Sequence, residues 1–218
     1  MKKICFAIIL ISCFVCVGCS SPIYNLVIKN MSDMRINFFE GENEELYAEL
    51  SCGYREQTFA YDGISTDKLE CGVLGVVFKN EYSYSSICVN LTIDGTSKEY
   101  VLERSPFEYK YMVDLEKIVD NKSEITLSLK NQSLVCALKC VSDDWKVQYT
   151  DALKIATEHF KDDLDIVYSN GKFLAEGYLK VVSKYDYEQK FWYFSFIDRA
   201  KTTKSVLIDV STGKLFDN

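Results

Sequence analysis

Histidine is almost absent from this sequence, which contains one imidazole, His159, among 218 residues. Metal centres and nucleophilic sites that need several histidines are therefore largely excluded. Two prolines and ten glycines are too few for a collagen-like or low-complexity chain. The formal net charge of −7 shows no excess of basic residues that would neutralise phosphates. We therefore expect a globular protein with no nucleic-acid partner, and we expect His159 to be a half-exposed structural residue.

Long apolar runs are confined to the N-terminus. Lys2 and Lys3 precede an apolar stretch over residues 4–17, and small residues follow it. A basic start, a short apolar stretch and small residues at its end are typical of a secretory signal. The stretch is short for a membrane-spanning helix, which needs about 20 apolar residues. The sequence therefore predicts a signal peptide over residues 1–18.

The end of this signal resembles a bacterial lipobox. Val17, Gly18 and Cys19 match the last three positions of that motif, whereas the position before them, normally aliphatic, is Cys16. The resemblance implies that Cys19 receives a diacylglyceryl group and that residues 19–22 form a lipidated cysteine and a short tether. Two or more acyl chains give stable anchoring, so the body would lie at the outer side of the cell membrane, with membrane lipid as a partner. The alternative is an ordinary signal peptide cleaved near Gly18.

Five cysteines remain beyond the leader and Cys19, so at least one is free or pairs between chains. Cys136 and Cys140 fall on one predicted strand and share a face, but they would lie about 13 Å apart, too far for a disulfide. We favour small buried side chains, and unpaired thiols would suit a reducing habitat. The sequence leaves open the disulfide state of Cys52, Cys71, Cys88, Cys136 and Cys140.

Residues 23–143 are predicted to form an all-β sandwich. The segment contains about nine short apolar runs separated by turn residues and no strong helical pattern. The run over residues 86–93 alternates cleanly, and the Asp94-Gly95 pair after it predicts a hairpin. Residues 23–29 are expected to be the first strand.

A different pattern begins at Trp145. Residues 149–161 have helical spacing, with Leu153, Ala156 and Phe160 on one face. Three strand-like runs follow. Residues 146–218 are therefore predicted to form a small α+β domain with one helix on an antiparallel sheet, and the whole chain is predicted to be of mixed class.

This C-terminal segment resembles a PepSY-like module, which is cystatin-like in having one helix across a small sheet. The resemblance rests on DALKIA at residues 151–156 and VLIDVSTGKL at residues 206–215. The chain departs from that family in its long aromatic middle strands and its single copy. The resemblance implies a binding module and supplies no catalytic residues. Asp209 is expected to hydrogen-bond the turn at Thr212-Gly213.

The strand over residues 190–198 is aromatic or apolar on both faces, with Phe191 and Tyr193 opposite Trp192. One helix covers one face of a small sheet, so the second face must meet the sandwich, another chain or a ligand. Domain packing and a peptide groove are both consistent with this pattern. The residues predicted for that binding or domain-interface surface are Trp192, Tyr178, Phe194 and Phe196.

These patterns predict a lipid-anchored extracytoplasmic protein that binds a peptide or an exported protein, with no catalytic residues, no cofactor and no metal. An envelope hydrolase is the alternative from another class, and it would need two carboxylates about 5 to 10 Å apart in a cleft. A structural envelope component is a third possibility. The acidic excess lies in residues 22–145, where it indicates either a cationic partner or divalent cation, or solvated strand faces.

Overall fold

The structure is a computed structural model. It describes residues 22–57, 66–80, 84–106, 109–130, 135–170, 172–184 and 187–217. The predicted signal peptide and Cys19 lie outside these residues, and the lipobox remains a prediction.

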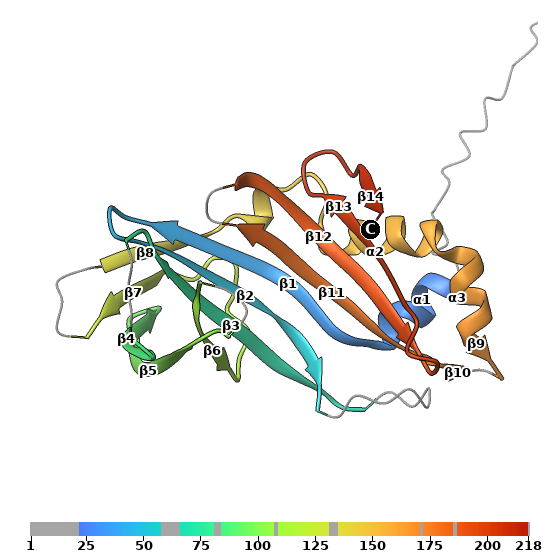
Figure 1. The fold of residues 1–218 in the computed structure, drawn as a ribbon, viewed down its shortest axis with the longest axis horizontal. Helices are drawn as coiled ribbons and strands as arrows, with labels where there is room; N and C mark the ends of the chain where they lie inside the picture. Colours follow the sequence, from blue (N-terminus) through green and yellow to red (C-terminus); the bar gives the residue numbers. More distant parts are fainter. Residues whose placement is uncertain are drawn as a thin grey trace, which may run out of the picture.

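Eight antiparallel strands close into a barrel in the first part of the chain (Figure 1). Their order around the barrel is β1-β2-β3-β6-β5-β4-β7-β8, and β8 pairs back onto β1, where Cys140 lies opposite Phe39. Each of the eight strands therefore has a neighbour on both sides. The strands are β1 (Met31–Glu42), β2 (Leu46–Glu56), β3 (Lys68–Phe78), β4 (Ser86–Ile93), β5 (Thr96–Arg104), β6 (Tyr111–Leu115), β7 (Ile125–Leu129) and β8 (Val135–Cys140).

The predicted sandwich followed by a small α+β domain is wrong. The described chain is mostly β, with a closed eight-stranded barrel, additional strands and three short α-helices. Alternation along a strand is the same in a sandwich and in a barrel, so the pattern identified strands without fixing how they pair. Closure depends on the pairing of β1 with β8, which is remote in sequence.

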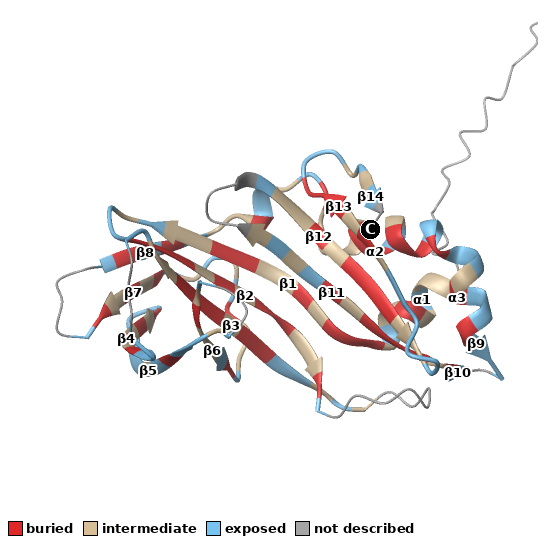
Figure 2. Cartoon of the chain, in the orientation of Figure 1, coloured by how far each residue is buried: buried red, intermediate tan, exposed pale blue. Residues whose placement is uncertain are grey.

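Apolar side chains fill the barrel interior. Alternate residues of each strand point inward, and those of β4 are buried in strict alternation. Eight-stranded barrels are just wide enough for side chains to fill them. Figure 2 shows the buried positions recurring along the barrel strands. The largest fully buried members of this core are Phe39, Leu46, Leu50, Leu74, Leu91, Leu102 and Leu115.

Four further strands extend the sheet beyond the barrel. β11 (Ala175–Lys184) pairs parallel with the start of β1. The next three strands are antiparallel, namely β12 (Tyr187–Asp198), β13 (Thr203–Asp209) and the edge strand β14 (Leu215–Asp217). The two-residue strands β9 (Tyr168–Ser169) and β10 (Lys172–Phe173) form a separate hairpin. We call β11 to β14 the extension.

Helices cover one face of the extension (Figure 1). They are α1 (Pro22–Lys29), α2 (Tyr149–His159) and α3 (Lys161–Val167). Leu153 and Ala156 of α2 are buried together with Trp192 and Phe194 of β12, as helical spacing predicted. A short 3-10 turn, η1 (Ser142–Asp144), connects β8 to this layer.

The first apolar run of the described chain is helical, so the predicted strand over residues 23–29 is wrong. Its β-branched residues favour strands, but the spacing also places Ile23 and Val27 four residues apart on one helical face. Pro22 suits a first helical position, and Asn30 ends the helix by donating to the Leu26 carbonyl at 2.8 Å. Val27 is buried in the core beneath α2 and α3. No described helix has the length and apolar character needed to cross a membrane.

Candidate functional site

Strand β1 belongs to both parts of the molecule. Its first half pairs with β11, and its second half closes the barrel against β8. Its register shifts against β11 between Met31 and Asp33 and against β2 between Arg35 and Asn37. Such irregularities bend a strand and re-aim its side chains. They lie where β1 leaves the extension and enters the barrel.

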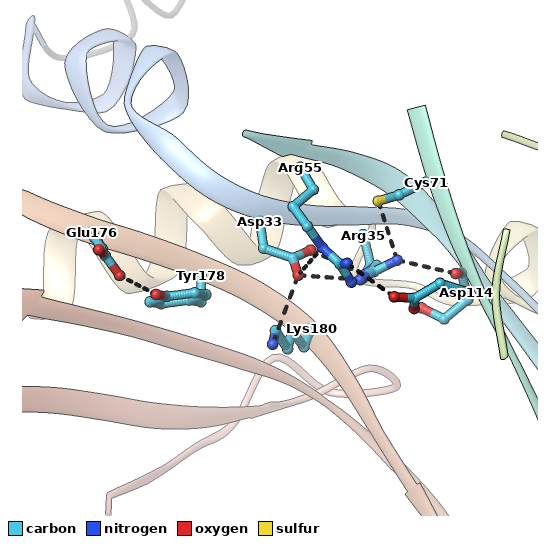
Figure 3. Close-up of polar contacts among 9 residues, drawn as sticks. Asp33, Arg35, Arg55, Cys71, Asp114, Glu176, Tyr178 and Lys180 are labelled. Atoms are coloured by element: carbon cyan, nitrogen blue, oxygen red, sulfur yellow. Dashed lines mark hydrogen bonds and ion pairs between the residues drawn. The ribbon is translucent and has the colours of Figure 1, made fainter. Parts of the chain in front are cut away.

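A cluster of charged side chains lies at this division (Figure 3). Arg35 contacts Asp33 at two points, with Nε 3.0 Å from Oδ1 and Nη2 3.1 Å from Oδ2. Two more cations converge on the same Oδ2: Nε of Arg55 lies at 3.4 Å and Nζ of Lys180 at 3.7 Å. Asp114 pairs with Nη1 of Arg55 at 3.4 Å. These five residues, Asp33, Arg35, Arg55, Asp114 and Lys180, are the junction cluster.

Exposure rises steeply across the junction cluster. The Asp33 and Arg35 side chains are 3% and 5% exposed, whereas those of Arg55, Lys180 and Asp114 are 32%, 47% and 68% exposed. Breaking a buried ion pair is costly because a charge is left uncompensated, whereas surface pairs contribute about 0–1 kcal/mol. The cluster therefore has a fixed inner pair and an accessible outer rim of two cations and one carboxylate.

Neighbouring groups hold Arg35 in place and shift the pKa values of Arg55 and Cys71. Nη1 of Arg35 also donates to the Ser51 carbonyl at 3.3 Å and lies 3.4 Å from Sγ of Cys71. Burial lowers the pKa of the Arg55 guanidinium, but Asp33 and Asp114 more than offset it and the pKa lies above its ordinary value. Burial raises the pKa of the Cys71 thiol, which the nearby Arg35 only partly opposes. Cys71 is therefore a protonated neighbour of the cluster rather than a reactive thiolate.

The face of the extension opposite the helices carries accessible apolar side chains. Val182 and Phe216 are 42% and 37% exposed, and the rings of Phe191 and Phe216 meet edge to face with centroids 5.6 Å apart. Lys180, Tyr193, Leu207 and Phe216 follow one another in register from β11 to β14, so this surface is continuous with the junction cluster. We call Val182, Phe191, Tyr193, Leu207 and Phe216 the outer patch.

Three of the four residues predicted for a binding or interface surface lie in the core beneath the helices. Trp192 and Phe194 are fully buried and Phe196 is 2% exposed. The Trp192 indole donates to the Val147 carbonyl at 2.8 Å, and its ring meets Trp145 edge to face. These side chains pack against the chain's own helices and offer no accessible surface.

The fourth residue, Tyr178, lies on the opposite face, beside the junction cluster. Its hydroxyl donates to the carboxylate of Glu176, which is 5% exposed. Nζ of Lys180 lies 5.3 Å from the centre of its ring. In Figure 3, Tyr178 lies between Glu176 on one side and Lys180 on the other. The structure thus brings Tyr178 together with Asp33 rather than with Trp192, since Tyr178 pairs with Asp33 across β11 and β1.

Asp209 holds the final turn, as predicted. Its Oδ1 accepts hydrogen bonds from the backbone amides of Ser211 and Thr212, both at 2.8 Å, while Oδ2 accepts from Gln189 at 2.6 Å. Burial raises the pKa of Asp209, but these hydrogen bonds outweigh it and hold the pKa well below its ordinary value. Gly213 follows with a φ of +74°, which favours glycine. This aspartate is structural.

The cysteines and the histidine singled out in the sequence stand apart from the junction cluster. The five cysteines named above are free thiols, and Cys52 is buried inside the barrel, where burial raises its pKa to about 11. His159 is exposed on α2 with its ring against Phe160. A hollow of about 410 Å³ is lined by residues of β7, of β8 and of the turn before β7. Among the described residues, no three His, Cys, Asp or Glu side chains are placed to hold a metal ion.

Sequence reasoning missed the junction cluster because its members come from β1, β2, β6 and β11. One local signal was present: Asp33 and Arg35 stand two apart in a strand-like run, which places opposite charges on one face. Comparison with known proteins adds no further residue, because no family model, no curated protein and no solved structure matches this chain.

Proposed function

We propose that this chain is a lipid-anchored extracytoplasmic binding protein whose exposed sheet face docks an exported polypeptide. The anchor is Cys19, on the strength of the lipobox resemblance. The docking face consists of the outer patch and the outer rim of the junction cluster.

The observation that carries this proposal is the one-sided covering of the extension. Helices bury the Trp192 side of β12, while the outer patch on the other side stays accessible beside Arg55 and Lys180. Contiguous apolar patches bordered by polar residues mark interaction sites, and aromatic residues and arginine are enriched at protein interfaces. A rigid sheet is also a good support for such a surface, since little conformational freedom is lost on binding.

Site-specific photo-crosslinking in the cell that makes the protein tests the docking face. A benzophenone side chain at Tyr193 is expected to give one discrete adduct with an exported protein. The matched control is the same group at Val101, which is 51% exposed on the barrel strand β5. Equal adducts from both positions, or none from Tyr193, would contradict the proposal.

Detergent phase partitioning tests the anchor separately. The full-length protein is expected in the detergent phase, and Cys19→Ser is expected to move it to the aqueous phase or leave it unprocessed. Mass spectrometry of the N-terminal peptide would identify the acyl chains. A wild-type protein that keeps its first residues and stays in the aqueous phase would contradict the anchor and leave the docking face to be judged by crosslinking.

A further inference from the structure

Two cations of the junction cluster are arranged to bind an additional carboxylate. Arg55 and Lys180 both contact Oδ2 of Asp33, at 3.4 and 3.7 Å, which is longer than an optimal charge-assisted hydrogen bond. Asp33 is already held at two points by the buried Arg35. Arginine has five N–H donors and lysine three, so both outer cations retain donor capacity beyond these long contacts.

The charge balance favours an anionic partner at this spot. The junction cluster contains three cations and two carboxylates, on a chain whose formal net charge is −7. Asp114, the outer carboxylate, is 68% exposed and lies 3.4 Å from Arg55, so a ligand can replace it at little cost. Glu176 lies on the far side of Tyr178 and accepts a hydrogen bond from that phenol.

The outer patch lies at a fixed distance from these cations. Lys180 is on β11 and Phe216 is on β14, three strand spacings away in register. At about 4.8 Å per spacing this is about 14 Å, which an extended peptide spans in about four residues. A segment crossing the strands would therefore meet the cations and the aromatic end of the patch with side chains about four positions apart.

We propose that the docking face binds an acidic segment of an exported polypeptide, with a carboxylate between Arg55 and Lys180 and an apolar or aromatic side chain about four residues away on the outer patch. This inference rests on the proposed function and assigns the chemistry of the partner. Tyr178 forms one wall of the carboxylate site, because its ring lies against Lys180 and its hydroxyl is held by the buried Glu176.

Binding of designed peptides to the full-length protein in detergent tests the assignment by fluorescence anisotropy. The probe is a labelled serine-rich octapeptide with one glutamate and one phenylalanine four positions apart, and the matched control replaces the glutamate by glutamine. The glutamate peptide is expected to bind at least about tenfold more tightly, because hydrogen bonds between charged groups are the stronger ones. Equal affinities, or no binding of either peptide at about 1 mM, would overturn the assignment.

Substitutions of Arg55 and Lys180 test whether these two side chains cause the preference for the glutamate peptide. Arg55→Gln and Lys180→Gln are each expected to reduce the preference for glutamate at least about fivefold while leaving the glutamine peptide unchanged. The control is Lys154→Gln on α2, whose side chain is 58% exposed and lies on the helix-covered side. A preference that survives both substitutions overturns the site, as does a preference lost equally in Lys154→Gln.

Two outcomes separate this inference from the proposed function. If inorganic phosphate at low millimolar concentration displaces the probe while acetate does not, the site selects phosphate and the carboxylate assignment is overturned. If Tyr193 crosslinks a partner through a segment without acidic residues, the docking face stands and the carboxylate assignment fails. If Tyr193 gives no crosslink, both the docking face and the carboxylate assignment are contradicted.

Discussion

The two faces of β12 differ in how they are covered, although both are aromatic. Trp192, Phe194 and Phe196 lie under α2 and α3 and are 0–2% exposed. Phe191 and Tyr193, on the alternate positions, stay half-exposed next to Phe216 and Lys180. Aromatic content alone therefore does not distinguish core from binding surface. What distinguishes them is which face the connecting helices cover.

The largest loss of stability is expected when Trp192 is replaced. Trp192→Ala removes a fully buried ring and its hydrogen bond to Val147, and it is expected to lower the free energy of unfolding by about 3–5 kcal/mol. The control, Phe216→Ala on the opposite face, is expected to cost about 1 kcal/mol or less, because that side chain is already 37% exposed. Urea denaturation followed by tryptophan fluorescence or circular dichroism measures both. Similar losses for the two variants would mean that the outer patch is also core.

The junction cluster gives a comparable contrast between its inner and outer members. Asp33→Asn leaves the buried Arg35 without its counter-charge and is expected to cost about 3–5 kcal/mol. Asp114→Asn, at the exposed rim, is expected to cost about 1 kcal/mol or less. Denaturant midpoints of the two variants provide the measurement. A small loss in Asp33→Asn would show that the inner pair does not fix the cluster.

A smaller effect, dependent on pH, is expected at the final turn. The ionised Asp209 accepts several hydrogen bonds and its pKa is lowered, so it stabilises the fold above its unfolded-state pKa of about 4. That contribution is lost as the pH falls toward the folded-state pKa. Asp209→Asn is therefore expected to be less stable than the wild type at pH 7 by about 1–2 kcal/mol, with the difference narrowing below pH of about 4. A difference independent of pH between 7 and 3 would contradict an ionised turn aspartate.

Thiol labelling, which changes the protein least, compares a cysteine inside the barrel with one on its outer side. Cys52 is fully buried inside with a pKa of about 11, whereas Cys88 is half-exposed. A thiol reagent is expected to modify Cys88 in the native protein and to leave Cys52 at least about 100-fold slower, because only the thiolate reacts. Peptide mapping after timed labelling measures the two rates, and unfolding in denaturant should make all five thiols reactive. Equal native rates would indicate that the barrel opens readily.

The sequence predicted most local features, apart from the helix α1, but it did not predict the pairing of distant strands. The alternation of Trp192 with Tyr193 correctly assigned opposite faces, and the spacing of Leu153 and Ala156 correctly placed a buried helical face. The barrel could not be predicted because closure joins Phe39 to Cys140, and no periodicity records that pairing. The candidate site could not be predicted for the same reason, because Asp33 contacts Arg55 and Lys180 only when β1 lies between β2 and β11.

Because β1 pairs with strands of both the barrel and the extension, the order in which the strands are synthesised matters. A chain made from its N-terminus produces β1 before every other described strand, yet two of its partners, β8 and β11, are made far later. Until then, its backbone amides and carbonyls form an open edge, and such edges recruit other chains. Pairings between distant segments also form slowly. The side of β1 that faces β8 and β11 is therefore not fully paired until the last third of the polypeptide has been made.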